Sequence, residues 1–265
     1  MDKRLARLGG TLIALCAFLS GCYHLQSADA PMDVLYYPHH NGYQASEELP
    51  LVRSSDLLIL LPGMGNRIDS FEQAGVLEQL AQAQIPVDAV MVDAHFAYYR
   101  ARNFLPRLQQ DVLLPAREAG YQRVHLAGIS LGGFGSLLYW QYNLDQPTEG
   151  LPVASAMLLT PYLGEPEYYA HRLNPQLSPQ LVSEDKNIWL WLEQLPPEQR
   201  QHWYLGLAEQ DEFYQANRTF ADLLPEDQVF TTPGGHTWDS WRDLWPRVLA
   251  QFKRDFFQSP TEESP

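Results

Sequence analysis

The stretch VHLAGISLGG, residues 124–133, decides the fold of this 265-residue chain. Its first four residues are typical of a buried strand, and a helical pattern runs on from Phe134. Ser130 lies between them on a sharp turn with strained backbone angles, where side chains at Gly128 and Gly132 would collide with the strand and the helix. The order of strand, turn and helix predicts that the Ser130 hydroxyl projects alone in front of a helix N-terminus, which stabilises developing negative charge.

The rest of the sequence alternates between short apolar runs and helical patterns. We expect strands at 57–61, 87–92, 124–127, 154–159, 203–207 and 229–231, and helices at 71–84, 104–119, 133–143, 213–224 and 241–257. Such alternation predicts an α/β fold, with a mostly parallel sheet that helices cover on both faces. In sheets of this kind the ligand site lies at the carboxyl ends of the strands.

A serine hydroxyl becomes a strong nucleophile only when a neighbouring base removes its proton. Of the eight histidines, His236 has the most suitable setting, because it follows a predicted strand in the glycine-permitted loop PGGHTW, residues 233–238. The other histidines lie before the sheet, inside a strand or outside any comparable loop. We therefore predict that His236 is the base for Ser130.

The imidazole in turn needs an acid that orients it. Asp211 follows the predicted strand 203–207 and gives the chain order Ser130, Asp211, His236 that is expected of a hydrolase sheet. Glu209 and Glu212 are close competitors, and Glu209 is the stronger of the two alternatives. We predict Asp211 as the acid and leave Glu209 open.

An oxyanion that forms on the substrate needs two backbone N–H donors. We expect one from Leu131, directly after the nucleophile, and the other from Met64 in the loop PGMGN, residues 62–66, which follows the first strong strand. The Met64 side chain would then border the acyl site. The alternative for this loop is a plain glycine turn.

Three stretches together, LLPGMG (60–65), GISLGG (128–133) and GHTWDSW (235–241), resemble the α/β-hydrolase superfamily, and in particular the esterase D and feruloyl-esterase type. The similarity covers about residues 55–257. It implies the α/β-hydrolase fold and a Ser-His-Asp acyl-enzyme mechanism on an ester of a small molecule, with no cofactor and no metal. Thioesterase, lipase, peptidase or acyltransferase chemistry uses the same residues. A hydrolase-fold lipoprotein that only binds a ligand or partner is the non-enzymatic alternative.

Residues 161–201 interrupt the rhythm of strands and helices and are rich in proline and aromatic residues. They are placed where hydrolases often insert a small cap over the site. A cap would supply an apolar wall for an acyl or aromatic group, and we assign Tyr162 and Trp238 to substrate binding. Trp189 and Trp191 fit a cap and ordinary core packing equally well.

Asp93, His95 and Tyr98 follow another predicted strand and are candidates for the rim of the pocket. Asp93 could equally brace a neighbouring loop. The sequence contains no His-x-x-x-His or Cys-x-x-Cys pair, so it predicts no metal site.

The N-terminus has the layout of an export signal, with a positive start and an apolar run at residues 11–19. The exit LSGC resembles the bacterial lipobox, which implies cleavage after residue 21 and lipidation of Cys22. Tyr23 after the lipidated position favours the outer membrane, facing the periplasm. The alternative is an ordinary signal peptide with an incidental cysteine. Cys16 lies within the signal, so the folded domain can form no disulfide.

The composition is that of one globular domain, with a formal net charge of −14. This charge argues against a nucleic-acid partner, because phosphates need a basic surface. We expect a tether with irregular structure at 22–54, the hydrolase domain at 55–257 and a frayed tail at 258–265.

Overall fold

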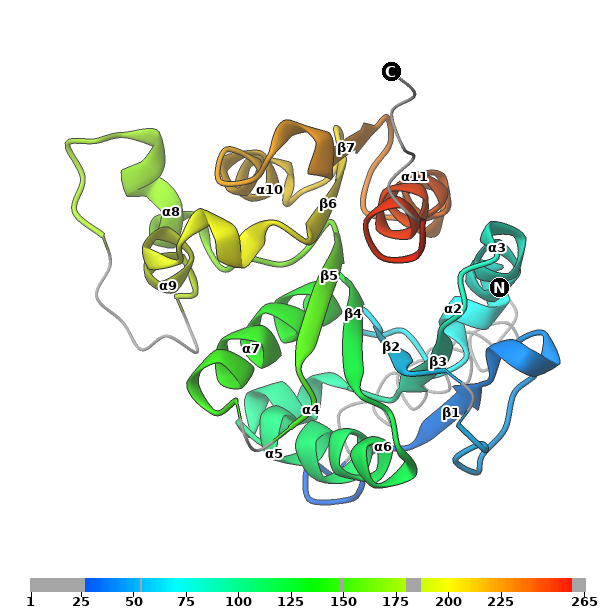
Figure 1. Cartoon of the computed structure of the whole chain (residues 1–265). Coiled ribbons are helices and arrows are strands. Elements are labelled where there is room, and N and C mark those ends of the chain that lie inside the picture. Colours follow the sequence, from blue (N-terminus) through cyan, green and yellow to red (C-terminus); the bar gives the residue numbers. More distant parts are fainter. Residues whose placement is uncertain (1–26, 53, 148–149, 180–186, 259–265) are drawn as a thin grey trace, which may run out of the picture.

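The computed structural model describes residues 27–52, 54–147, 150–179 and 187–258 (Figure 1). Within these residues the centre is a seven-stranded sheet of order β1-β3-β2-β4-β5-β6-β7. The strands are β1 (Val34–Tyr37), β2 (Asp56–Leu61), β3 (Asp88–Val92), β4 (Arg123–Ile129), β5 (Val153–Leu159), β6 (Trp203–Ala208) and β7 (Val229–Thr232). Only β1 runs antiparallel to its neighbour, β3. The sheet is therefore mostly parallel, as the alternating pattern predicted.

Helices cover both faces of the sheet (Figure 1). They are α2 (Ser70–Gln73), α3 (Val76–Ala83), α4 (Phe96–Arg100), α5 (Phe104–Leu108), α6 (Leu114–Ala119), α7 (Leu131–Asp145), α8 (Pro166–Leu173), α9 (Trp189–Gln194), α10 (Tyr214–Ala221) and α11 (Trp238–Phe257). Short 3-10 turns lie at His39–Asn41, Pro197–Arg200 and Glu226–Gln228, and a π-helical turn at Gln109–Leu113 joins α5 to α6. Helices α2, α3 and α11 lie on one side of the sheet, and α4 to α7 lie on the other.

Alternate residues of the buried strands feed two separate cores. In β2, Leu58 and Leu60 pack in the cluster that contains α3 and α11, whereas Leu57 and Ile59 pack in the cluster that contains α5, α6 and α7. Because side chains alternate between the faces of a strand, a strand covered on both sides is apolar throughout. This explains the unbroken run at 57–61.

Three predicted helices differ from the observed ones. The segment 71–84 is two helices, because Gly75 takes the left-handed conformation (φ 78°) between α2 and α3. The segment 104–119 stays helical but includes the π-helical turn Gln109–Leu113. The last helix begins at Trp238 instead of Trp241, one turn closer to His236.

The folded domain begins earlier than the predicted boundary at residue 55. Strand β1 pairs with β3, and Tyr37 and Tyr43 are buried. The Tyr43 hydroxyl donates to the carbonyl oxygens of Ile85 and Val87, at 2.8 and 3.0 Å. These contacts tie the segment expected to be a tether to the edge of the sheet.

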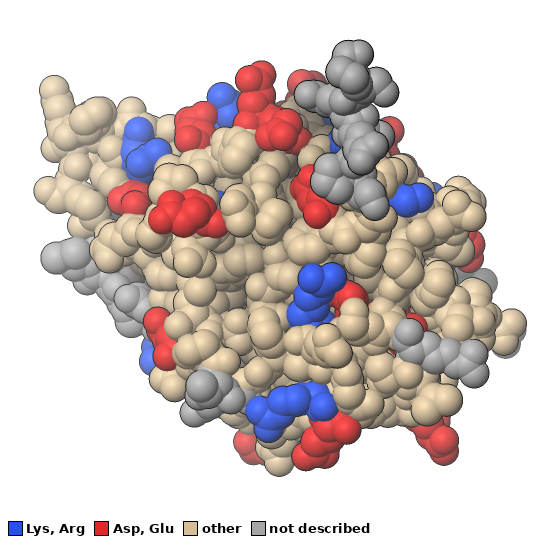
Figure 2. Space-filling view, in the orientation of Figure 1, with Lys and Arg blue, Asp and Glu red and all other residues tan. Residues whose placement is uncertain are grey.

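The predicted signal, Cys16, Cys22 and Tyr23 lie outside the described residues, as does the tail from residue 259. In the described ranges no helix combines the length and the apolar character that crossing a membrane requires. Figure 2 shows acidic and basic side chains interspersed over one face of the molecule.

The segment 161–201, for which we expected a small cap, contains α8 and α9, and α8 packs beside α10 (Figure 1). Residues 180–186 of it lie outside the description. The Trp189 indole is buried and donates to the carbonyl oxygen of Leu163 at 2.8 Å, while the ring of Trp191 lies 5.9 Å from that of Trp203. Both tryptophans therefore take part in packing against the rest of the domain.

Candidate active site

Ser130 occupies the turn between β4 and α7 in a conformation that few residues adopt. Its φ of 55° and ψ of −117° lie in a strained region for a residue with a side chain. A Cβ atom at Gly128 would overlap the carbonyl group of Gly132, and one at Gly132 would overlap that of Leu61. The two glycines are thus required by the close approach of strand and helix, as the motif predicted.

Backbone hydrogen bonds to the end of β5 hold Ser130 in this strained turn. Its N–H donates to the carbonyl oxygen of Leu159, and its own carbonyl accepts from the N–H of Tyr162, each at 3.0 Å. The residue is 8% exposed. The serine is therefore fixed from both sides while part of it still reaches solvent.

His236 and Asp211 are paired. Nδ1 of the imidazole lies 2.7 Å from Oδ2 of the carboxylate. Because a carboxylate only accepts, Nδ1 carries the proton, and Nε2 is the basic nitrogen of the neutral ring. The Asp211 side chain is fully buried, and its other oxygen accepts from the Phe213 N–H at 2.7 Å. The competing carboxylates of Glu209 and Glu212 are exposed.

Thr160 also contacts this histidine, and the sequence did not single it out. Its Oγ1 lies 3.2 Å from Nδ1 of His236 and accepts from the indole N–H of Trp241 at 2.9 Å. The residue is fully buried and has a φ of 41°, which is unusual for a β-branched residue. The strained threonine therefore lies between the imidazole and the last helix.

Two aromatic rings contact the imidazole, and one of them also belongs to the lining of the cavity at Ser130. The rings of Phe213 and Trp241 meet His236 nearly at right angles, with centroids 5.0 and 5.1 Å away. Phe213 also lines the cavity that contains Ser130. The nucleophile candidate and the base candidate thus share one neighbour, at the carboxyl ends of β4 and β7.

The cavity at Ser130 has a volume of about 300 Å³. Its lining residues are mostly apolar: Met64, Phe96, Ser130, Leu131, Tyr162, Glu165 and Phe213. Both residues predicted to supply oxyanion donors are among them. A Cβ atom on Gly63 would lie 3.3 Å from that of Ser130, so the loop before Met64 passes directly beside the serine.

Esterases are among the solved structures to which this chain is similar in fold. Est1E from Butyrivibrio proteoclasticus is 18% identical, with a TM-score of 0.56 over 84% of this chain and 93% of that one. An arylesterase is 14% identical, with a TM-score of 0.55 over 88% and 84%. An esterase of Pyrobaculum calidifontis is 14% identical, with a TM-score of 0.54 over 96% and 94%.

The chain has the α/β-hydrolase fold. At identities of 14% to 18% the likeness concerns the fold. No family model matches the sequence, and no curated protein matches it.

Of the two residues that we assigned to substrate binding, Tyr162 lines the cavity at Ser130, and Trp238 is absent from its lining. The Tyr162 hydroxyl donates to Oε1 of Glu165 at 3.1 Å. Burial, and next the hydrogen bond to Glu165, raises the pKa of Tyr162 to about 12. The ring of Trp238 instead packs against Phe71 and Trp241, with centroids 5.6 and 5.1 Å away. Because α11 begins one turn early, Trp238 is directed toward α2.

Asp93, His95 and Tyr98 are absent from the lining of the Ser130 cavity. The Asp93 N–H donates to the carbonyl oxygen of Asp33 at 2.9 Å, and the Tyr98 hydroxyl donates to that of Ala30 at 3.1 Å. These residues therefore hold the N-terminal segment against the domain. The alternative in which Asp93 braces a neighbouring segment is the one observed.

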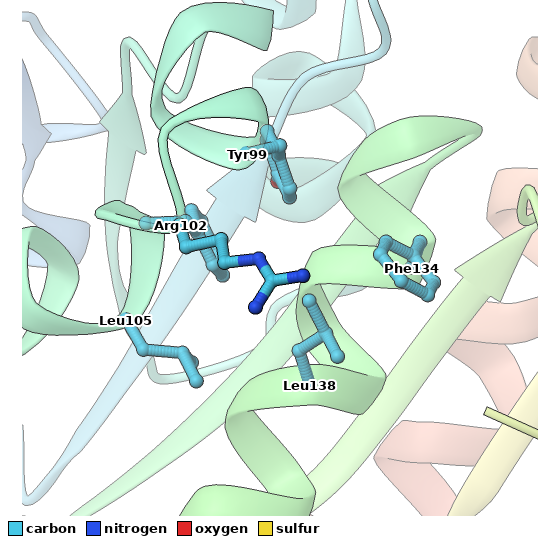
Figure 3. Close-up of a pocket in the computed structure, with 6 residues that line it drawn as sticks. Tyr99, Arg102, Leu105, Phe134 and Leu138 are labelled. Atoms are coloured by element: carbon cyan, nitrogen blue, oxygen red, sulfur yellow. The ribbon is translucent and has the colours of Figure 1, made fainter. Parts of the chain in front are cut away.

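A second cavity, of about 230 Å³, lies beside α7 (Figure 3). The Arg102 side chain extends across it toward α7, which carries Phe134 and Leu138. The ring of Phe134 meets that of Tyr162 edge to face, with centroids 6.0 Å apart. Phe134 lines the second cavity and Tyr162 lines the one at Ser130, so this ring pair joins the linings of the two cavities.

Proposed function

We propose that the chain is a serine carboxylesterase that cleaves a small ester through an acyl-enzyme. The observation that carries the proposal is the hydrogen-bonded pair of His236 and Asp211, which shares Phe213 with the strained Ser130. A serine on such a turn, a base whose far nitrogen is unprotonated and a buried acid are the parts that acyl transfer needs.

In the proposed reaction, Ser130 Oγ attacks the ester carbonyl carbon while His236 Nε2 accepts the hydroxyl proton. The carbonyl oxygen becomes negative, and the backbone N–H groups of Leu131 and Met64 stabilise it. The C–O bond then breaks, and His236 gives its proton to the leaving alcohol. A water molecule then gives a proton to His236 and attacks the carbonyl carbon of the acyl-Ser130 ester. The bond to Ser130 Oγ breaks, the acid is released, and His236 returns the proton to the serine oxygen.

Two features of the backbone support these oxyanion donors. Leu131 is the first residue of α7, so its N–H has no acceptor within the helix. Within the described ranges, the N–H of Met64 donates to no backbone acceptor. Both residues line the cavity that contains Ser130.

The test is hydrolysis of a short p-nitrophenyl ester by the purified protein. We expect measurable turnover that Ser130→Ala abolishes. Ser178→Ala, which changes an exposed serine after α8, should keep the activity. A folded wild-type protein without turnover, and without reaction with a fluorophosphonate, would contradict the proposal and favour a binding protein on a hydrolase fold.

We also propose that the enzyme is exported and anchored by lipid on Cys22. The sequence motif carries this proposal, and a separate experiment tests it. Metabolic labelling with palmitate in a bacterial host should mark the wild-type chain and leave Cys22→Ser unlabelled. Labelling of both variants, or of neither, would contradict lipidation at this cysteine.

A further inference from the structure

The cavity at Ser130 combines aromatic rings with a single carboxylate. The aromatic residues Phe96, Tyr162 and Phe213 line it, and Glu165 is the charged member of its lining. Aromatic faces attract cations through their quadrupole, and a carboxylate attracts them through its charge. Rings together with one negative group are the features that recognise an alkylammonium ion.

A short chain of hydrogen bonds connects the Glu165 carboxylate to the backbone of Ser130. It precedes α8, whose first residue is Pro166, and its Oε1 accepts from the Tyr162 hydroxyl at 3.1 Å. The N–H of the same tyrosine donates to the carbonyl oxygen of Ser130 at 3.0 Å. Tyr162 therefore bridges the Glu165 carboxylate and the Ser130 backbone, which places this exposed carboxylate at the cavity.

We propose that Glu165 determines specificity and selects esters whose acyl part carries an alkylammonium group over those whose acyl part carries a carboxylate. This inference rests on the proposed esterase function. Ammonium charge near Glu165 is attracted, and a substrate carboxylate is repelled by it. Because Glu165 is exposed to solvent, the attraction is modest and weakens as salt is added.

The test uses three p-nitrophenyl esters of matched size. One carries γ-trimethylammoniobutyrate, the second has carbon in place of the quaternary nitrogen, and the third carries glutarate, which is anionic. The leaving group is the same in all three. The value of kcat/KM for each charged ester is divided by that for the neutral ester. This ratio is then compared between wild type and Glu165→Gln. The comparison cancels differences in intrinsic reactivity between the esters.

Glu165→Gln keeps an acceptor for the Tyr162 hydroxyl and removes only the charge. We expect it to lower the cation-to-neutral ratio about threefold to fivefold and to raise the anion-to-neutral ratio by a similar factor at low salt. Both changes should shrink at about 1 M salt. Glu167→Gln is the matched control, since it removes the same charge two residues further on, from an exposed side chain absent from the cavity lining.

The role of Glu165 would be overturned if the charged-to-neutral ratios of kcat/KM were equal in wild type and Glu165→Gln. It would also be overturned if Glu167→Gln changed these ratios as much. In both cases the esterase function would stand. Absence of Ser130-dependent hydrolysis of the neutral ester would instead overturn the proposed function, and the specificity with it.

Discussion

Nδ1 of His236 lies 2.7 Å from Oδ2 of Asp211, and the second oxygen of that buried carboxylate is occupied by the Phe213 N–H. Asp211→Asn would present an amide to the ring and stabilise the wrong tautomer. We predict that kcat for an activated ester falls by about 10³ to 10⁴, with KM little changed.

Glu209→Gln is the control for this substitution, because Glu209 is the alternative acid and its side chain is exposed. Steady-state kinetics on one ester should leave Glu209→Gln close to wild type. A large loss of kcat in Glu209→Gln, together with an active Asp211→Asn, would exchange the roles of the two residues.

Thr160→Val removes the oxygen that contacts Nδ1 of His236 and accepts from the Trp241 indole, with almost no change of shape. The buried indole N–H is left without this acceptor, which lowers the free energy of unfolding by about 1–3 kcal/mol. Since the imidazole also loses a contact, we predict a fall in kcat of about tenfold.

Thr160→Ser keeps the oxygen and should retain most of the activity of wild type. Urea unfolding and kinetics are measured on the same preparations. If Thr160→Val is less stable but keeps the wild-type kcat, the threonine supports the fold alone.

Gly128→Ala is predicted to disrupt the turn at Ser130, because the new Cβ atom would overlap the Gly132 carbonyl. We expect a loss in the free energy of unfolding above about 3 kcal/mol, or failure to fold. Gly235→Ala is the matched control, since a Cβ atom there makes an ordinary contact, 3.4 Å from the carbonyl oxygen of Gln210. Equal melting temperatures for Gly128→Ala and wild type would contradict the geometry of the turn.

The stability of the protein should fall in acid, first through a buried histidine. Burial lowers the pKa of His125, although the nearby Asp56 opposes this shift. Nε2 lies 3.0 Å from Asp56, and Nδ1 lies 2.8 Å from the Ser155 hydroxyl. Below about pH 6.5 the unfolded chain binds a proton that folded His125 refuses, so stability declines by up to about 1.4 kcal/mol per pH unit.

Asp56 extends this decline to lower pH. Burial alone would raise its pKa, but hydrogen bonds from His125, Arg123 and Ser55 outweigh burial and hold the pKa well below its usual range. Its contribution to stability is complete above about pH 5 and is lost as the pH falls further. Urea unfolding at about pH 7, 5 and 4 should show continuous loss, and a flat profile would contradict both assignments.

The turn at Ser130 could be predicted from the sequence because its requirements are local. A strand, two glycines and a helix within ten residues determine the turn, and the loops that carry Asp211 and His236 directly follow strands. The order of parallel strands then places those loops at one edge of the sheet.

Features that depend on distant contacts were missed or misplaced. Thr160 contacts His236 and Trp241, which lie 76 and 81 residues further along the chain. Its positive φ could not be predicted from the sequence, because a threonine rarely adopts it. Strand β1 is short, and its attachment to the domain depends on distant residues. The hydroxyl of Tyr43, which follows β1, donates hydrogen bonds to residues more than forty positions further along the chain. Trp238 was assigned to substrate binding, but it is the first residue of α11, where its ring packs against Phe71 and Trp241.

The central claim is that the Ser130 hydroxyl is the nucleophile, and fluorophosphonate labelling followed by mass mapping of the modified peptide tests it most directly. We predict a single modified residue, Ser130, with loss of esterase activity in proportion to labelling and no modification of Ser130→Ala. Modification at another serine, or full activity in a protein labelled at Ser130, would contradict the claim.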